Sequence, residues 1–130
     1  GPLLDRIDLH VEVPSVKFRD MNAQAGGETS AVVRERVIAA RDIQQRRWHG
    51  APACNARMQP RDLQRHCTLD EPARLLLRSA MEELDLSARA YDRILKVART
   101  IADLAHSEKL TAAHVSEAIQ YRSLDRQIWT

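Results

Sequence analysis

The feature that most constrains the fold is a series of apolar side chains that recur with helical spacing between residues 87 and 105. Its members are Tyr91, Ile94, Leu95, Ala98, Ile101, Ala102 and Ala105. Ser87 precedes them and is a favourable N-cap, so the pattern predicts an amphipathic helix that begins just after it. A helix with so wide an apolar face needs other elements to cover that face.

Further helices are predicted on both sides of this one. Residues 30–48 place apolar side chains near helical spacing, and residues 60–67 form a shorter pattern of the same kind. Asp70 and Thr111 are suitable N-caps for two more helices. The positions expected to face the core are Val33, Val37, Ala40, Ile43, Ala73, Leu76, Leu77, Ala80, Leu84, Val115, Ala118 and Ile119. Because the connections are short, we predict an all-α fold, a compact bundle of four to five helices.

Residues 7–13 carry a different pattern, in which apolar and polar side chains alternate until Pro14. The apolar members are Ile7, Leu9, Val11 and Val13. This alternation is typical of a strand, yet no later part of the chain resembles a partner strand. A lone strand cannot satisfy its backbone hydrogen bonds. Either the segment pairs with another molecule or its sheet belongs to a missing part of the protein, and we favour the second interpretation.

The sequence carries no sign of a metal centre or of a membrane segment. His49, Cys54, His66 and Cys67 form neither a Cys-x-x-Cys pair nor a His pair at ligand spacing, so ordinary packing is the better interpretation. No apolar stretch approaches the roughly 20 residues that span a bilayer, and the N-terminus carries no signal-peptide pattern. We therefore expect a cytoplasmic protein that does not enter a membrane.

Two stretches resemble a known family. Residues 1–9, Gly-Pro-Leu-Leu-Asp-Arg-Ile-Asp-Leu, resemble the segment that closes the AAA+ core in magnesium chelatases and related replicative helicases. Residues 86–104, Leu-Ser-Ala-Arg-Ala-Tyr-Asp-Arg-Ile-Leu-Lys-Val-Ala-Arg-Thr-Ile-Ala-Asp-Leu, resemble the lid helix of the magnesium-chelatase-like branch known as YifB or ComM. Residues 114–122 extend the match, so the resemblance covers most of the chain in the right order.

This resemblance implies a division of the chain into three parts. Residues 1–14 would be an extended remnant of the AAA+ ATPase core, residues 15–28 a linker, and residues 29–127 the helical, AAA+ lid-type domain. Without their sheet, residues 1–14 are expected to be disordered or to pair artificially.

The phosphate loop of such ATPases is missing from the chain. Its pattern ends in a Gly-Lys pair followed by Ser or Thr. The only glycines are Gly1, Gly26, Gly27 and Gly50, and none of them precedes a lysine. The chain therefore cannot form the main ATP cradle and is an accessory part of an ATPase.

The family resemblance also implies roles for two arginines. Such ATPases form homo-oligomeric rings, hexamers as a rule, with each nucleotide between neighbouring subunits. The arginine of the opening motif is the catalytic arginine finger, and that position is Arg6. The arginine early in the lid helix is the nucleotide-binding sensor 2, in its own or the neighbouring subunit, and that position is Arg89. ATP and Mg²⁺ would serve the full-length protein, and neither is expected to bind this part tightly. The implied partners are the missing core, the neighbouring subunits and, for the full-length protein, DNA.

Physical chemistry gives these two arginines further interpretations. If Ser87 is the N-cap, Arg89 is the second residue of its helix, where a cation opposes the helix dipole at a cost of about 0.3–1 kcal/mol. A phosphate at the helix N-terminus would reverse that cost, whereas the alternative is a freely solvated arginine. Arg6 lies between Asp5 and Asp8, so its alternative role is one end of a surface ion pair.

The remaining basic residues are interpreted as solvated helix faces. Arg93, Lys96 and Arg99 are expected to share an exposed face with Arg89, diluted by Asp103 and other acids. Three functions stay open for the parent protein: an ATP-driven motor acting on DNA in recombination or natural transformation, a metal-inserting chelatase subunit, or a non-enzymatic DNA-binding helical module. The lid sequence is closer to the first than to the second, and direct DNA binding by these faces is the less favoured interpretation.

Overall fold

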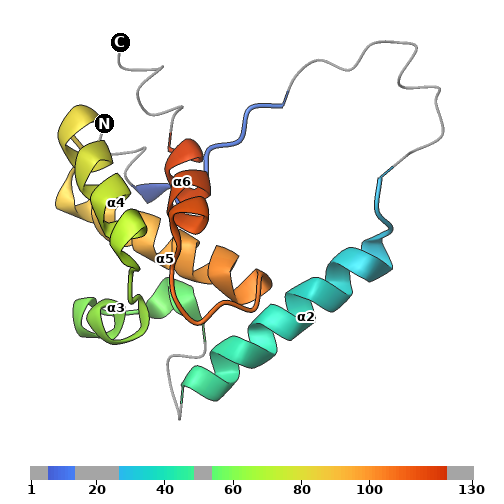
Figure 1. Ribbon diagram of the computed structural model, residues 1–130. Helices are drawn as coiled ribbons and strands as arrows, with labels where there is room; N and C mark the ends of the chain where they lie inside the picture. The colour runs from blue at the N-terminus through green and yellow to red at the C-terminus, as the bar shows by residue number, and fades with distance from the viewer. Residues whose placement is uncertain (1–5, 14–26, 49–53, 123–130) are drawn as a thin grey trace, which may run out of the picture.

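The computed structural model describes residues 6–13, 27–48 and 54–122. Within these ranges the chain forms five α-helices, one 3₁₀-helix and no strand. They are α2 (Ser30–Arg47), η2 (Asn55–Arg57), α3 (Pro60–His66), α4 (Glu71–Glu83), α5 (Ala88–Leu104) and α6 (Ala112–Gln120) (Figure 1). The predicted all-α bundle is therefore confirmed. Of the three predicted parts, residues 1–5, 14–26, 49–53 and 123–127 lie outside the described residues.

The helices begin where the sequence places their caps. The Asp70 carboxylate accepts a hydrogen bond from the Ala73 backbone N–H at 2.9 Å, and the Ser87 hydroxyl accepts one from the Ala90 N–H at 3.1 Å. Each cap satisfies a backbone donor that the first turn of a helix leaves without an intrahelical partner. The predicted starts of α4 and α5 are therefore confirmed.

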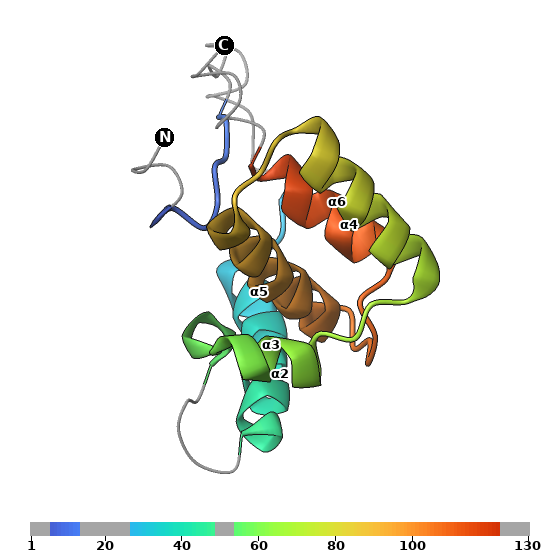
Figure 2. The same ribbon diagram turned by 90° about the vertical axis from the view of Figure 1, so that its left-hand side faces the viewer.

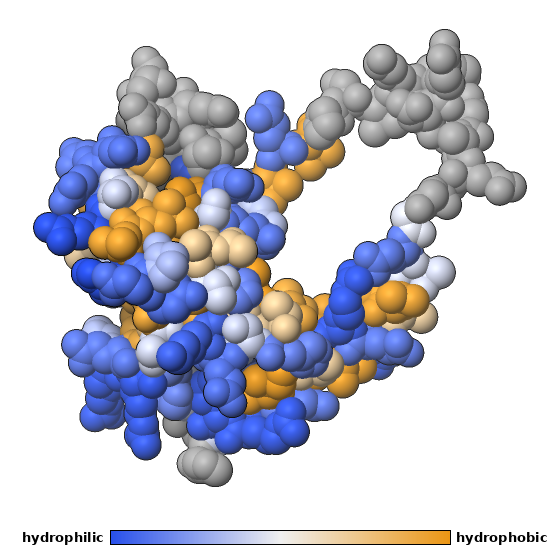
Figure 3. All heavy atoms as spheres, viewed as in Figure 1, coloured by the Kyte–Doolittle hydropathy of each residue, from blue (hydrophilic) through white to orange (hydrophobic). Residues whose placement is uncertain are grey.

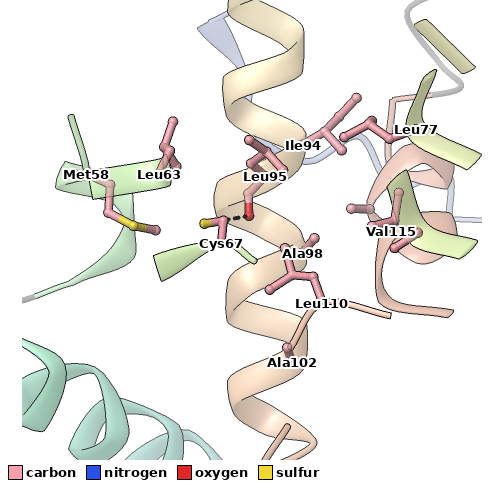
Figure 4. Packing of buried hydrophobic residues seen from close by; sticks show 12 residues of the cluster. Met58, Leu63, Cys67, Leu77, Ile94, Leu95, Ala98, Ala102, Leu110 and Val115 are labelled. Atoms are coloured by element: carbon pink, nitrogen blue, oxygen red, sulfur yellow. Dashed lines mark hydrogen bonds between the residues drawn. The ribbon is translucent and has the colours of Figure 1, made fainter. Parts of the chain in front are cut away.

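Helix α5 lies at the centre of the bundle. It packs against α6 on one side, with α4 beyond it, and against α2, η2 and α3 on the other (Figures 1 and 2). Figure 4 shows Leu77 and Val115 on one side of α5 and Met58 and Leu63 on the other. The buried cluster consists of Met58, Leu63, Cys67, Ala73, Leu77, Ile94, Leu95, Ala98, Ala102, Leu110, Val115 and Ala118. Most of the apolar face predicted for α5 is therefore in the core.

The two connectors around α4 and α5 are joined by backbone hydrogen bonds. Leu110 donates its N–H to the carbonyl of Thr68 at 2.9 Å, and its own carbonyl accepts from the Asp70 N–H at 3.1 Å. Both connectors end at helix N-caps, so this contact fixes the starts of α4 and α6 relative to each other.

Helix α2 is buried over only part of its length. Ala40 and Gln44 are buried, whereas Val33 and Val37, on the same stripe, keep 41% and 46% of their surfaces exposed. Figure 1 shows the reason: the N-terminal half of α2 extends away from the other helices. The prediction that Val33 and Val37 face the core is therefore wrong for this chain, because no described element lies over them.

The N-terminal segment 6–13 is extended and contacts the bundle. His10 donates its backbone N–H to the Tyr121 carbonyl at 2.8 Å, and the Arg122 guanidinium donates to the Ile7 carbonyl at 2.7 Å. Of the two outcomes expected for this segment, disorder or pairing outside its own sheet, the described residues show contacts with the end of α6. The alternating residues Ile7, Leu9, Val11 and Val13 are all exposed. Their apolar side therefore lacks the cover that a sheet would give.

Candidate functional site

Arg89 occupies the position that the sequence predicts for it. It is the second residue of α5, after the N-cap Ser87, and its side chain is exposed. Within the described part of the chain, no hydrogen bond or ion pair involves its guanidinium. A cation in the first turn faces the positive end of the helix dipole, so its own helix disfavours this placement. An anionic group at this end of α5 would reverse the balance, because both the guanidinium and the dipole would then attract it.

The N-terminal segment brings Arg6 to the same end of the molecule. Asp8 forms an ion pair with Arg93, which stands one helical turn after Arg89. Arg6 precedes Asp8 by two residues and is exposed, with no partner in the ranges that the structure describes. Figure 2 shows segment 6–13 beside the N-terminal half of α5, which is the end of the helix that carries Arg89.

The opposite end of α5 holds a buried polar cluster centred on Asp103. This carboxylate is 1% exposed. Arg47 of α2 donates to both of its oxygens, at 2.5 and 3.0 Å, and the Asn55 amide donates to Oδ2 at 2.9 Å. Arg99 adds a hydrogen bond from Nε to Oδ1 at 3.2 Å. Two guanidinium groups thus share one buried carboxylate, which stabilises the charges only while all partners remain in place.

Arg99 also donates hydrogen bonds to three backbone carbonyls. Its guanidinium donates to the carbonyl of His66 at 3.0 Å, to that of Glu108 at 2.8 Å and to that of Ser107 at 2.6 Å. The group therefore joins the end of α3 to the loop between α5 and α6. Burial lowers the pKa of the guanidinium, and Asp103 opposes that shift.

The prediction of an exposed basic face along α5 is wrong at Arg99. This side chain is 2% exposed, and the acid expected to dilute the face, Asp103, is buried beside it. One sequence signal could have identified the cluster. Arg99 and Asp103 are opposite charges four residues apart, and both border the buried positions Leu95 and Ala102, an arrangement that suits a paired, partly desolvated site.

Beside this cluster lies a cavity of about 430 Å³, lined by residues of α2, α3, α5 and the following loop. Its lining includes Arg47, Arg65, His66 and Asp103. Burial and the nearby Arg47 charge lower the pKa of His66, so the imidazole is neutral near pH 7. Among the described residues, no three His, Cys, Asp or Glu side chains lie close enough to hold a metal ion. None of the described helices combines the length and apolarity that crossing a bilayer requires.

Comparison with known proteins places this arrangement in context. Residues 27–122 match the family model for the C-terminal part of ChlI, a subunit of magnesium chelatase. The chain is 43% identical over 127 residues to the competence protein ComM of Haemophilus influenzae, and 39% identical over the same length to the protein YifB of Escherichia coli. In both comparisons the match covers 97% of this chain and 24% of the relative.

A mycobacterial relative, from Mycobacterium bovis, is 38% identical over 124 residues, which are 94% of this chain and again 24% of the relative. The chain thus spans about a quarter of the length of the curated relatives that it matches.

Proposed function

This chain belongs to the family of magnesium chelatase ChlI C-terminal domains, and from that premise we propose that it is the nucleotide-sensing lid of a ring-forming AAA+ ATPase. Arg89 binds the phosphates of ATP·Mg²⁺, and Arg6 acts as the arginine finger toward a nucleotide in a neighbouring subunit. The rest of the nucleotide site belongs to the core that precedes the lid. The assembled ATPase works in the cytoplasm.

The observation that carries the proposal is the placement of Arg89. It is exposed, has no partner within the described residues and stands in the first turn of α5, where the helix dipole disfavours a cation. A side chain that opposes a local preference of its helix, with no stabilising contact in return, is typical of a functional position. A guanidinium at this point fits a phosphate group, since its planar fork can donate two parallel hydrogen bonds to phosphate oxygens.

The position of α5 suggests how phosphate contact would be transmitted. Arg89 is at one end of α5, and Asp103 at the other end is bonded to Arg47 of α2. A force on the first turn of α5 therefore moves α2 with it, so the lid responds to nucleotide as one body. Hinge motion of this type biases two arrangements of a subunit without reshaping its core.

For the parent protein we propose a motor that acts on DNA. The support is the similarity to a protein named for competence, across nearly the whole of this chain. A metal-inserting chelatase subunit would use the same lid chemistry, so the two are separated by whether DNA or a porphyrin stimulates ATP hydrolysis by the full-length protein.

The proposal is tested on the full-length protein that carries this chain. Replacing Arg89→Ala removes a charged hydrogen-bonding group from the phosphates, so ATP affinity is expected to fall about 10- to 100-fold. Replacing Arg6→Ala should leave ATP affinity unchanged and reduce kcat by about 10³-fold or more, as for other arginine fingers. The matched control is Arg34→Ala, which removes an exposed arginine of α2. If Arg89→Ala binds and hydrolyses ATP like the control, Arg89 is not a sensor.

A further inference from the structure

The positive charge of the chain is concentrated at one end of the bundle. Residues 41–66 contain six arginines and two aspartates, a net charge of +4, whereas the whole chain has a net charge of only +2. This stretch contains the end of α2, η2 and α3, which lie together at the lower edge of Figures 1 and 2. Hydrophilic side chains gather there in the space-filling view of Figure 3. The rest of the molecule is therefore slightly acidic.

Five exposed arginines at this end have no partner within the described residues, and they are Arg41 and Arg46 of α2 and three on η2 and α3. Arg57 of η2 and Arg61 and Arg65 of α3 are exposed, and no hydrogen bond or ion pair involves them within the described residues. Arg61 and Arg65 stand one helical turn apart and so lie on the same face of α3. We call these three residues the basic ridge. Exposed arginines elsewhere are often paired, as Arg74 is with Glu71 and Arg78 with Glu82.

Helix stability does not explain the basic ridge. A cation is favoured in the last turn of a helix, where it faces the negative end of the dipole. That explanation suits Arg65, which is next to the final residue of α3. It does not suit Arg61, in the first turn of α3, or Arg57, which precedes that helix by three residues. The ridge concentrates like charges at some cost to the isolated bundle, which an anionic partner would offset.

The surroundings of the ridge indicate the kind of partner. Among the described residues of 41–66, no large apolar side chain is exposed: Ile43 and Trp48 are half-buried, and Met58 and Leu63 are buried. Protein interfaces and membrane-binding surfaces both use exposed apolar groups at their centre. Binding to nucleic acid can depend on the phosphate backbone alone, through arginine and lysine contacts.

We propose that the basic ridge is a nucleic-acid-binding surface that contacts the phosphate backbone without reading sequence. This deepens the proposed function, on which it rests for the presence of DNA near the lid. Lys96 extends the surface, because its ammonium donates to the Ala56 carbonyl beside Arg57. Arg89 is on the first turn of α5 and takes no part, so nucleotide and nucleic acid use different residues of one domain.

The test is fluorescence anisotropy of this 130-residue chain with a labelled 20-base-pair DNA duplex, without ATP. The triple variant Arg57→Gln, Arg61→Gln, Arg65→Gln should bind at least tenfold more weakly at 50 mM salt. Three lost phosphate contacts should also make the slope of log K against log salt shallower by about 2.7. From that slope, their contribution to affinity declines about 40-fold between 50 and 200 mM salt.

The matched control removes the same charge elsewhere, with Arg34→Gln, Arg74→Gln and Arg78→Gln. It should bind DNA like the unmodified chain within a factor of three, and so should Arg89→Ala. Absence of DNA binding at 50 mM salt, or an equal loss of DNA affinity in both triple variants, would overturn the proposal that the basic ridge binds nucleic acid. So would equal binding of a poly-glutamate peptide of matched charge, which would assign the surface to an acidic protein. An effect of Arg89→Ala on ATP in the full-length protein is independent of all these outcomes, so either proposal can fail alone.

Discussion

The two ends of α5 use arginine in opposite ways. At the N-terminal end, Arg89 is exposed, and among the described residues it has no partner and Arg93 pairs only with Asp8 of the N-terminal segment. At the C-terminal end, Arg99 is buried, and its guanidinium donates hydrogen bonds to Asp103 and to three backbone carbonyls. The residue type and the helix are the same, and ten residues separate Arg89 from Arg99.

The difference arises from what the other elements place beside each end. Helices α2 and α3 and the loop after α5 surround the C-terminal end, so charges there must be paired to be buried. At the N-terminal end Ala90 and Ile94 are buried against the bundle, but Arg89 stays exposed to solvent and Arg93 meets only the N-terminal segment, through Asp8, among the described residues. An arginine at the closed end is thus committed to structure, whereas one at the open end remains available to a ligand. Three predictions test this division.

The largest effect is expected at the closed end, from Asp103→Asn. This change keeps the shape of the side chain but leaves Arg47 and Arg99 without a neutralising charge in a buried site, which typically costs about 3–5 kcal/mol. Urea unfolding followed by circular dichroism measures that loss of unfolding free energy. Asp92→Asn is the matched control, because Asp92 is on the less buried half of the same helix. A cost below 1 kcal/mol for Asp103→Asn would mean that the cluster does not hold the closed end together.

The asymmetry was only partly predictable from the sequence. The starts of α4 and α5 were predictable, because Asp70 and Ser87 accept hydrogen bonds from backbone groups three residues away. The buried cluster was not predictable, because Arg47 and Asp103 are 56 residues apart and their contact depends on how two helices pack. The overhang of α2 was missed for the same reason. Periodicity shows which side of a helix is apolar, and it does not show how far along the helix a neighbour extends.

The candidate site was predictable in a different sense. The assignments of Arg6 and Arg89 come from motif positions, and the structure adds that both are exposed at the same end of the molecule. Their roles stay predictions, because a phosphate contact belongs to two partners and this chain supplies one of them. The basic ridge was not predicted from the sequence, because Arg57, Arg61 and Arg65 are divided between two short elements. Their common exposure and lack of partners emerge only in three dimensions.

The second prediction uses pH to test the burial of a side chain that packs against α5. Cys67 lies against α5, with its sulfur 3.9 Å from the Leu95 carbonyl (Figure 4). Burial raises the pKa of this thiol from 9.0 to about 11. The unfolded chain therefore loses the thiol proton first, and stability present below pH 9 is lost as pH rises toward and through 11, by about 2 kcal/mol.

Urea unfolding between pH 8 and pH 11 measures this loss. The Cys67→Ala variant should be less stable at pH 8, because it leaves a cavity, but its stability should decline less over the same interval. Cys54 is less buried and supplies the control, since Cys54→Ala should keep the full decline. If the unmodified chain, Cys67→Ala and Cys54→Ala lose the same stability over this interval, burial does not raise the pKa of the Cys67 thiol.

The smallest effect is expected at the open end, from Arg89→Ala, and its sign carries the argument. Removing a cation from the first turn of α5 relieves an unfavourable interaction with the helix dipole, and alanine is the best helix former. The unfolding free energy should therefore stay within about 0.5 kcal/mol of the unmodified chain and move toward greater stability. Arg93→Ala is the matched control on the same helix: it loses the ion pair with Asp8 and should be destabilised, by no more than about 1 kcal/mol.

Urea unfolding at low salt, where the interaction with the helix dipole is least screened, compares the Arg89→Ala and Arg93→Ala variants. An Arg89→Ala variant destabilised by more than 1 kcal/mol would show that Arg89 holds the bundle together as Arg99 does, and the two ends of α5 would then not differ in kind. A stabilised Arg89→Ala variant that has also lost ATP affinity in the full-length protein would show that the open end gives up stability for binding.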